Sequence, residues 1–449
     1  MKKILIANRG EIARRIIRTC ERLGIETVAI HSEADGDLPY VSEATEAVLI
    51  GPNPVAQSYL QMDKIIETAK AHGADAIHPG YGLLSENADF ARKVAEAGLI
   101  FIGPSADIIE KMGDKLESRQ TMAKAGVPVV PGTEEGVSTL EEAIEAALTI
   151  GYPLMLKASA GGGGIGMVRC ENEQALSQQL ASVKNRAKAY FGNDAVYLEK
   201  FIPASRHIEV QVFGDSYGNI VHLYERNCSV QRRNQKVIEE SPSPDLPEEV
   251  RLRLCQAAVQ AAEAVQYTNA GTVEFIVDEN NEFYFLEMNT RLQVEHPVTE
   301  EVTGFDLVEW QIDVARGGTL PAQSSIKTEG HAIEYRIYAE DPKTFFPSPG
   351  LLQTLEWGPD ARIETGYEQG NTVTPFYDPM ISKIIITGAD RSEALRKSQT
   401  FFNHATIIGV KTNLPLYKEF IGSEEFASGE YATSVLPEWM AKIKEEQGL

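Results

Sequence analysis

Short apolar runs alternate with amphipathic runs over the first hundred residues, and this alternation restricts the fold more than any other feature of the sequence. Residues 3–7 (KILIA) and 26–32 (ETVAIHS) have the composition of strands, and residues 10–24 between them repeat isoleucine at helical spacing before ending on glycine. Further strand-like runs lie at 75–80 and 100–103. Strands and helices that alternate in this way form a parallel sheet covered by helices, so we expect an α/β fold.

Composition argues against several classes of function. The chain has 65 Asp and Glu against 42 Lys and Arg, a net charge of −23, which is unfavourable for binding nucleic acid or an anionic membrane. The first turn, ANRGEIA, lacks the G-x-G-x-x-G spacing of a dinucleotide site. The four cysteines lie far apart without C-x-x-C spacing, as in proteins of a reducing compartment. No apolar run approaches a membrane span, and the first one ends at Asn8, too early for a signal peptide. We expect a cytoplasmic protein with neither nucleic-acid nor membrane partners.

The remaining chain divides into two further sections. A length of 449 residues accommodates roughly two to four domains. The second section begins near residue 112, and its expected elements are a helix at 138–151 with Ser138 as N-cap and Glu141 three residues on, a strand at 152–159, strand pairs 206–214 with 219–227 and 271–278 with 282–289, and a long helix at 250–266. The third section starts near His331 and is mostly strand-like, with one helix expected around 392–402.

A run of four glycines interrupts the second section, in KASAGGGGIGMV at 157–168. A flexible linker has a similar composition, but this run follows a strand ending in Lys157 and an apolar segment resumes directly after it. Such a loop brings backbone N–H groups against phosphate oxygens, and Lys157 adds a positive charge. Lys115 is a second lysine that would join it. The spacing is not that of a P-loop.

The strand pair 271–278 and 282–289 indicates a metal site. With a four-residue turn at 279–282, Glu274 lies opposite Glu287, and Asn289 lies two residues further on the same face. Opposed carboxylates repel each other and need a cation between them. Two carboxylates and an amide oxygen suit magnesium or manganese. The alternative is a pair of solvated glutamates on an edge hairpin.

Basic residues flank this hairpin in an otherwise acidic chain. NTRLQVEHPVTE supplies Arg291, Gln293 and Glu295, and CSVQRRNQK supplies further arginines and Lys236. A small anion beside a metal–phosphate centre would need such a clamp, and Glu295 would then serve as a general base. Taken singly, each residue is more typical of a surface ion pair, but their position beside the predicted metal hairpin favours the anion site.

Several longer runs together resemble one family. They are ILIANRGEIA, HPGYGLLSEN, MGDK, KASAGGGGIGM, EFYFLEMNTRLQVEHPVTE, IEYRIYAEDP and PFYDPMI, and in this order they resemble biotin carboxylase, the ATP-grasp component of biotin-dependent carboxylases. The resemblance covers essentially the whole chain, and EMNTRLQVEHPVTE is its most specific part. It implies a Rossmann-like N-terminal domain at 1–111, an ATP-grasp domain at 112–330 with a mobile glycine-rich lid at about 130–203, and a mainly β C-terminal domain at 331–449.

The resemblance also implies roles for individual residues. ATP would contact Lys115, Lys157, Gly162, Gly163, Gly164, Glu199, Lys200, Ile202, His207, Gln231, Asn234, Glu274 and Glu287. Magnesium or manganese, as two ions, would be held by Glu274, Glu287 and Asn289. Bicarbonate would bind Lys236, Arg291, Gln293 and the Val294 backbone, Glu295 would remove its proton, Arg336 would stabilise the biotin enolate, and Tyr81 would pack near biotin.

The implied reaction carboxylates biotin through carboxyphosphate. The sequence has no Met-Lys-Met biotinylation motif, so biotin is expected on a separate biotin carboxyl carrier protein, with carboxyltransferase subunits acting afterwards. The resemblance implies a homodimer and, most often for a stand-alone subunit, the first half-reaction of acetyl-CoA carboxylase in fatty acid biosynthesis. Propionyl-CoA and pyruvate systems use the same half-reaction, so the final acceptor stays open.

Two departures from the family pattern keep other functions open. Ile165 stands where many relatives have a basic residue, with Ala160 replacing a glycine, and Asn234 stands where a histidine is usual. Neither departure touches the residues expected to act on bicarbonate. The alternatives are an ATP-grasp ligase for another carboxylate and a nucleotide-binding homologue without turnover. Biotin-dependent ADP release distinguishes the three.

Overall fold

The computed structural model describes residues 1–159 and 166–446. Its N-terminal part is a five-stranded parallel sheet in the order β3-β2-β1-β4-β5, which confirms the expected alternation. The strands are β1 Lys3–Ile6, β2 Glu26–Ser32, β3 Glu46–Gly51, β4 Ala76–His78 and β5 Ile100–Phe101, and the helices are α1 Gly10–Arg22, α2 Pro39–Glu43, α3 Met62–Ala71 and α4 Ala88–Glu96. The segments that follow the carboxyl ends of β1 and β4 begin at Ala7 and Pro79.

An eight-stranded antiparallel sheet forms the centre, in the order β13-β12-β9-β10-β11-β14-β19-β17. Its strands are β9 Arg206–Gly214, β10 Ile220–Arg232, β11 Gln235–Ser241, β12 Asn269–Val277, β13 Phe283–Asn289, β14 His331–Tyr338, β17 Arg362–Thr365 and β19 Met380–Gly388. Both expected strand pairs occur in it. β11 belongs to the second section of the sequence and β14 to the third, which starts near His331. The two strands pair directly, so both sections share one hydrogen-bonded sheet.

Helices cover this sheet at several places. The helix α9 Glu248–Ala264 lies over β9 and β10, where Leu254, Ala258 and Ala261 pack against Val210 and Val212. The others in the same region are α5 Ala106–Gly113, α6 Lys115–Lys124, α10 His296–Thr303 and α11 Leu307–Ala315. α10 begins directly after Glu295, six residues beyond the end of β13. This short connection carries the segment 290–295 across the end of the sheet.

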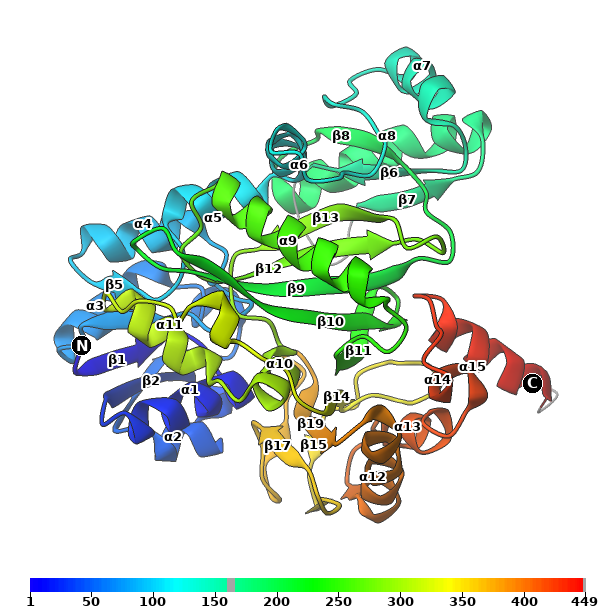
Figure 1. Ribbon diagram of the computed structural model, residues 1–449. Helices are drawn as coiled ribbons and strands as arrows, with labels where there is room; N and C mark the ends of the chain where they lie inside the picture. The colour runs from blue at the N-terminus through cyan, green and yellow to red at the C-terminus, as the bar shows by residue number, and fades with distance from the viewer. Residues whose placement is uncertain (160–165, 447–449) are drawn as a thin grey trace.

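A separate three-stranded sheet, β7-β6-β8, stands above the central sheet in Figure 1. It consists of β6 Leu154–Ala158, β7 Met167–Cys170 and β8 Val196–Lys200, and it packs against α7 Leu140–Ile150 and α8 Glu173–Phe191. The predicted N-cap of α7 was wrong by one residue. Thr139, not Ser138, accepts from the Glu142 N–H at 3.2 Å, and the Glu142 carboxylate accepts from the Thr139 N–H at 3.3 Å. Both residues precede a glutamate by three positions, but Val137 is held extended by a bridge to Val196, and the chain turns helical only after Thr139.

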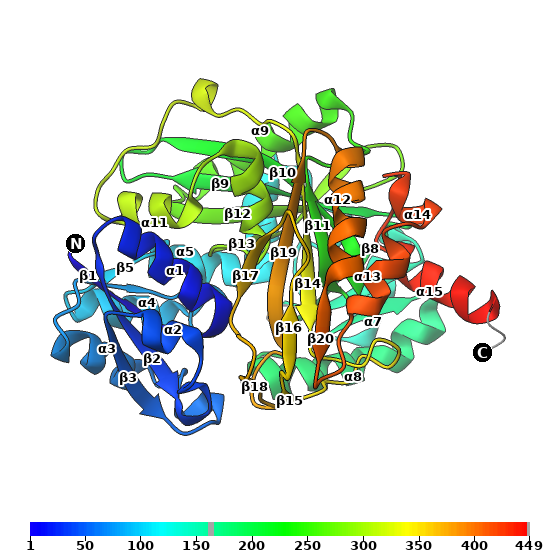
Figure 2. The ribbon, with the colours of Figure 1, turned by 90° about the horizontal axis from the view of Figure 1, so that it is seen from below.

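The C-terminal part adds helices to one side of the central sheet (Figure 2). The expected helix is α12 Arg391–His404, which packs on β19 and β14. Three helices were not expected from the sequence: α13 Leu414–Phe420, α14 Glu424–Ala427 and α15 Val435–Glu446. The first two are too short to show a periodicity, and they are recognisable only from the aromatic residues that they bury, Tyr417, Phe420 and Phe426. The remaining short strands are β15 Gly350–Leu351, β16 Thr354–Glu356, β18 Thr372–Val373 and β20 Thr406–Ile408.

Among the described residues, no helix is long and apolar enough to cross a membrane.

A buried glutamate ties the C-terminal helices to the sheet. Glu240 of β11 is fully buried, and its carboxylate pairs with His331 Nε2 at 2.6 Å and Arg391 Nε at 2.8 Å while Tyr431 donates its hydroxyl. Burial raises the pKa of Glu240, but the bond from His331 and the charge of Arg391 outweigh this effect and lower the pKa to about 2. The carboxylate therefore stabilises the fold when it is ionised.

The substitution Glu240→Gln tests this joint. We expect it to lower the free energy of unfolding at pH 7 by about 3 kcal/mol, because a pKa lowered by the fold contributes stability above the ordinary pKa. That contribution is lost as the pH falls towards 2, so the gap between the variant and the parent should narrow at pH 3.5. Urea unfolding at both pH values measures it. The exposed Glu356→Gln on β16 is the control, and an equal loss in both variants would contradict the assignment.

Candidate active site

One cavity of about 960 Å³ lies where these parts meet. Its walls come from the segments after β1 and β4, the β7-β6-β8 sheet, the central sheet and the segment 290–295. All predicted site residues within the described part of the chain line it: Tyr81, Lys115, Lys157, Glu199, Lys200, Ile202, His207, Gln231, Asn234, Lys236, Glu274, Glu287, Asn289, Arg291, Gln293, Val294, Glu295 and Arg336. Gly162, Gly163 and Gly164, with Ala160 and Ile165, lie outside the described residues.

The hairpin β12–β13 places Glu274 opposite Glu287, as expected, although the turn differs from the one assumed. Val277, not Asp278, pairs with Phe283, so the ladder beside the turn is shifted by one residue. A β-bulge at Leu286 then restores the predicted pairing from Glu274 onwards. Because of the bulge, the consecutive residues Leu286 and Glu287 both line the cavity. No feature of the sequence pattern indicates this bulge.

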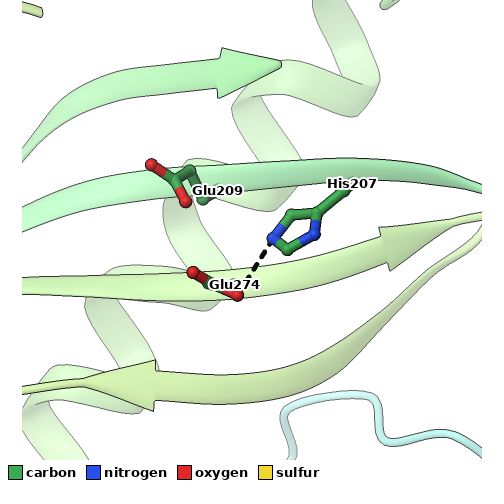
Figure 3. A group of neighbouring side chains, drawn as sticks. All are labelled: His207, Glu209 and Glu274. Atoms are coloured by element: carbon green, nitrogen blue, oxygen red, sulfur yellow. Dashed lines mark ion pairs between the residues drawn. The ribbon is translucent and has the colours of Figure 1, made fainter. Parts of the chain in front are cut away.

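A row of charged side chains runs across four neighbouring strands. Glu287 of β13 faces Glu274 of β12, Glu274 faces Glu209 of β9, and Glu209 faces Arg226 of β10. Figure 3 shows His207 and Glu209 on one strand and Glu274 on the next, with the imidazole of His207 directed at Glu274. The His207 Nε2 atom lies 2.9 Å from a Glu274 oxygen. Three carboxylates in one row are tolerated only where cations compensate them.

Lys236 supplies that compensation. Its ammonium lies 2.5 Å from Glu209, 2.8 Å from Glu274 and 2.7 Å from Glu295. Burial lowers the pKa of Lys236, but the three carboxylates raise it well above its ordinary value. The same carboxylates, with His207 and Cys228, have a spacing that suits a metal ion, but the ammonium already contacts the glutamates of both groups.

Glu295 is held from two sides. Its carboxylate lies 2.7 Å from Lys236 Nζ and 2.9 Å from Arg336 Nη2, and it is fully buried. Burial raises the pKa of Glu295, but Lys236 and Arg336 hold it well below the ordinary value. Arg336 also pairs with Glu239 at 2.6 Å. The carboxylate of Glu295 is thus ionised and can accept a proton once its cationic partners are drawn away.

The cavity combines lysines with apolar side chains at the end near β6 and β8. Lys157 Nζ lies 2.5 Å from Glu199, and Lys115 Nζ lies 2.9 Å from Glu287. The apolar lining beside them consists of Val130, Met155, Met167, Ile202, Ile276 and Leu286. Apolar side chains next to two ammonium groups have the chemistry of a site for a nucleotide base and its phosphates.

Asn234 has a structural explanation. Arg233 and Asn234 form the two-residue turn between β10 and β11, with φ of 50° and 64°. Asparagine is among the residues that adopt positive φ at low cost, so it suits this turn. Asparagine in place of the expected histidine therefore preserves the turn, and it also preserves the placement of Lys236 two residues later.

The predicted metal ligands have the right chemistry for a hard divalent cation. Glu274, Glu287 and Asn289 present two carboxylates and an amide from adjacent strands to the cavity. Cationic or donor groups now contact each of them, namely His207, Lys115 and the Arg291 guanidinium, the last at 3.1 Å from Asn289 Oδ1. Carboxylate and amide oxygens that are each in contact with a cationic or hydrogen-bond-donating group have the chemistry of ligands for magnesium or manganese.

Three family models match the chain in succession. The one described as Biotin carboxylase, N-terminal domain, matches residues 1–109, Carbamoyl-phosphate synthase L chain, ATP binding domain, matches 114–323, and Biotin carboxylase C-terminal domain matches 334–438. Biotin carboxylase 2 of Bacillus subtilis (strain 168) is 58% identical over 438 residues, 97% of this chain and 98% of that protein. The chain belongs to the biotin carboxylase family.

Other comparisons agree with this assignment. Methylcrotonoyl-CoA carboxylase subunit alpha, mitochondrial, of Rattus norvegicus is 51% identical over 97% of this chain, which spans 62% of that longer protein. The biotin carboxylase domain dimer of Hydrogenobacter thermophilus 2-oxoglutarate carboxylase, solved with MgADP, ADP and bicarbonate, has a TM-score of 0.94 and 46% identity, covering 97% of each chain. As a biotin carboxylase family member, the chain is a ligase with an ATP-grasp domain and the expected α/β fold class.

Sequence reasoning missed Glu209, although the biotin carboxylase motifs lie around it. It is fully buried, contacts Lys236, and pairs with Arg226 at 2.6 Å. A signal was present, because RHIEVQVFG alternates Ile208, Val210 and Val212 with polar residues, so one face of this strand is polar. The sequence of this strand does not indicate which residues of other segments lie against its polar face.

Removing the Lys236 ammonium should increase the repulsion among the carboxylates that it contacts, those of Glu209, Glu274 and Glu295. We expect Lys236→Met to lower the free energy of unfolding by at least about 3 kcal/mol, because it leaves buried carboxylates uncompensated. Adding Glu209→Gln should recover part of the loss, with a coupling free energy of at least about 1 kcal/mol in urea unfolding. Lys93→Met, which breaks a surface pair with Asp63, is the control and should cost less than about 1 kcal/mol. Additive losses for Lys236 and Glu209 would contradict the shared-ammonium description.

Proposed function

We propose that this chain carboxylates biotin on a separate biotin carboxyl carrier protein, through carboxyphosphate, as the first half-reaction of an acetyl-CoA carboxylase. The observation that carries the proposal is the buried contact of Lys236, Glu295 and Arg336 inside the cavity, beside Arg291 and Gln293. A base between two cations suits an anion that must lose a proton before it reacts. The 58% identity to Biotin carboxylase 2 over 98% of that protein supports biotin carboxylation as the reaction.

ATP occupies the end of the cavity near β6 and β8 in this proposal. The apolar side chains of this end receive the adenine beside Glu199, Lys200 and Ile202, and Lys115 and Lys157 contact the phosphates, with His207, Gln231 and Asn234 nearby. Gly162, Gly163 and Gly164 lie outside the described residues, and their contact with ATP stays a prediction. Glu274, Glu287 and Asn289 would hold magnesium or manganese, which would neutralise phosphate charge when bound.

Bicarbonate binds between Lys236, Arg291, Gln293 and the backbone of Val294. These groups already converge, because Arg291 Nη1 donates to Gln293 Oε1 at 2.7 Å and Gln293 Nε2 donates to Glu274 at 3.1 Å. Glu295 removes the bicarbonate proton, and an oxygen of the resulting anion attacks the γ-phosphorus, so that ADP leaves and carboxyphosphate forms. The incoming anion competes with Glu295 for Lys236, which raises the pKa of Glu295 at the moment when a base is needed.

Biotin reacts at the other end of the cavity. Carboxyphosphate breaks down to carbon dioxide and phosphate, the phosphate takes the proton of the biotin ureido nitrogen, and that nitrogen attacks the carbon dioxide. Arg336 stabilises the enolate charge, which exists only during the reaction, and Tyr81 packs near the ring. The proposed setting includes a homodimer and carboxyltransferase subunits, with acetyl-CoA as the final acceptor ahead of propionyl-CoA and pyruvate.

ADP release tests the proposal directly. With MgATP, bicarbonate and free biotin, we expect release that needs both bicarbonate and biotin. Glu295→Gln and Arg336→Ala should each lower kcat by at least about 100-fold, since each removes a group that acts in the chemical step. ADP release that does not depend on biotin would overturn the proposal in favour of another ATP-grasp ligase.

The metal assignment has its own measurement. Glu287→Gln should raise the magnesium concentration at half-maximal rate by at least about tenfold, because a ligand contributes no less than the groups that orient ligands. Glu282→Gln, in the turn of the same hairpin, should leave it unchanged. An unchanged magnesium requirement in Glu287→Gln would remove this residue from the metal site.

A further inference from the structure

Lys383 is a fully buried lysine beside the cavity that none of the assigned roles includes. It lies in β19, and its side chain has 0% exposure. An ammonium in such a place is costly unless it is paired and hydrogen-bonded. Its contacts therefore show what it is positioned to hold.

These contacts join three parts of the molecule. Lys383 Nζ donates to the Val294 carbonyl at 2.7 Å and lies 3.1 Å from a Glu11 oxygen of α1. Glu11 in turn accepts from the Tyr81 hydroxyl, and the Lys383 ammonium lies 5.8 Å from the centre of the Tyr81 ring. The lysine is thus in contact with the peptide before Glu295 and with the carboxylate that holds Tyr81.

The register of the sheet makes this arrangement specific. Lys383 of β19 pairs directly with Arg336 of β14. Arg336 holds the carboxylate of Glu295 at 2.9 Å, while Lys383 holds the carbonyl of the preceding residue. Two adjacent cations on one sheet therefore fix Glu295 at its side chain and at its main chain.

We propose that Lys383 is a positioning residue for biotin carboxylation. It sets the main chain at Val294 and so the place of Glu295 and of the bicarbonate that Val294 binds, and through Glu11 it orients Tyr81 towards biotin. The inference rests on the proposed function, because it assigns Lys383 a part in that same reaction. A lysine that only stabilised the fold would change the unfolding midpoint without changing the rate of the folded enzyme.

The test compares Lys383→Met with Lys383→Arg and with Lys397→Met. Lys397 of α12 is the matched control, because its ammonium donates to a backbone carbonyl of the same strand, that of Thr387, at 3.1 Å. Biotin-dependent ADP release is measured against ATP, bicarbonate and biotin, with thermal unfolding of each variant. We expect Lys383→Met to lose about 100-fold in kcat, the cost of a small misplacement of reacting groups, with KM for ATP unchanged. Lys383→Arg should have a kcat at least about tenfold higher than Lys383→Met, since it keeps the charge and the hydrogen-bond donor.

Each outcome decides the matter. A folded Lys383→Met that keeps kcat within about threefold of Lys397→Met overturns the inference while the proposed function stands. A parent chain without biotin-dependent release overturns both. If Lys383→Met does not fold, Glu11→Gln replaces it, with an expected rise of about tenfold in KM for biotin, because the Tyr81 hydroxyl loses its carboxylate partner. An unchanged KM for biotin in Glu11→Gln then rejects the link to Tyr81 and the inference with it.

Discussion

The ammonium of Lys236 sits among the carboxylates of Glu209, Glu274 and Glu295, and the rest of the site is arranged around this contact. The three glutamates come from β9, β12 and the segment before α10, so their mutual repulsion acts on three different elements. One buried cation makes it possible for all three to be present. The same cation keeps Glu295 ionised in the free protein and is the group that an incoming anion would draw away.

Further layers of charge surround this centre. Arg336 links Glu295 to Glu239, and Lys383 links the main chain before Glu295 to Glu11. Burial raises the pKa of Glu239 to about 7, although the charge of Arg336 opposes this effect. Because β14 and β19 supply Arg336 and Lys383, whose carboxylate partners lie on β11, on α1 and directly before α10, the C-terminal strands contribute to the site through electrostatics as well as through packing.

The continuity of the central sheet explains how distant segments act together. β11 pairs with β14, and β14 pairs with β19, so Lys236, Arg336 and Lys383 lie on neighbouring strands of one hydrogen-bonded ladder. The register of such a ladder is strongly constrained, because a slip of one residue moves each side chain of a strand to the other face of the sheet. The bulge at Leu286 is the place where the ladder departs from regularity, and it brings both Leu286 and Glu287 to the cavity.

The sequence by itself determined the alternation of the first hundred residues, the two strand pairs of the central sheet, the helices α7, α9 and α12, and the local run that carries Arg291, Gln293 and Glu295. It also predicted that Glu274 lies opposite Glu287, but from a turn that was one residue out of register, and the bulge at Leu286 restored the predicted pairing. Only the tertiary structure decided that Glu209 would meet Lys236, that Lys383 would reach Val294, and that a bulge would correct the hairpin register. The physical reason is that the periodicity of a strand identifies the face on which a residue lies, whereas the partner on the next strand depends on how distant segments pack. The polar face of 206–214 was therefore readable, and its partner was not.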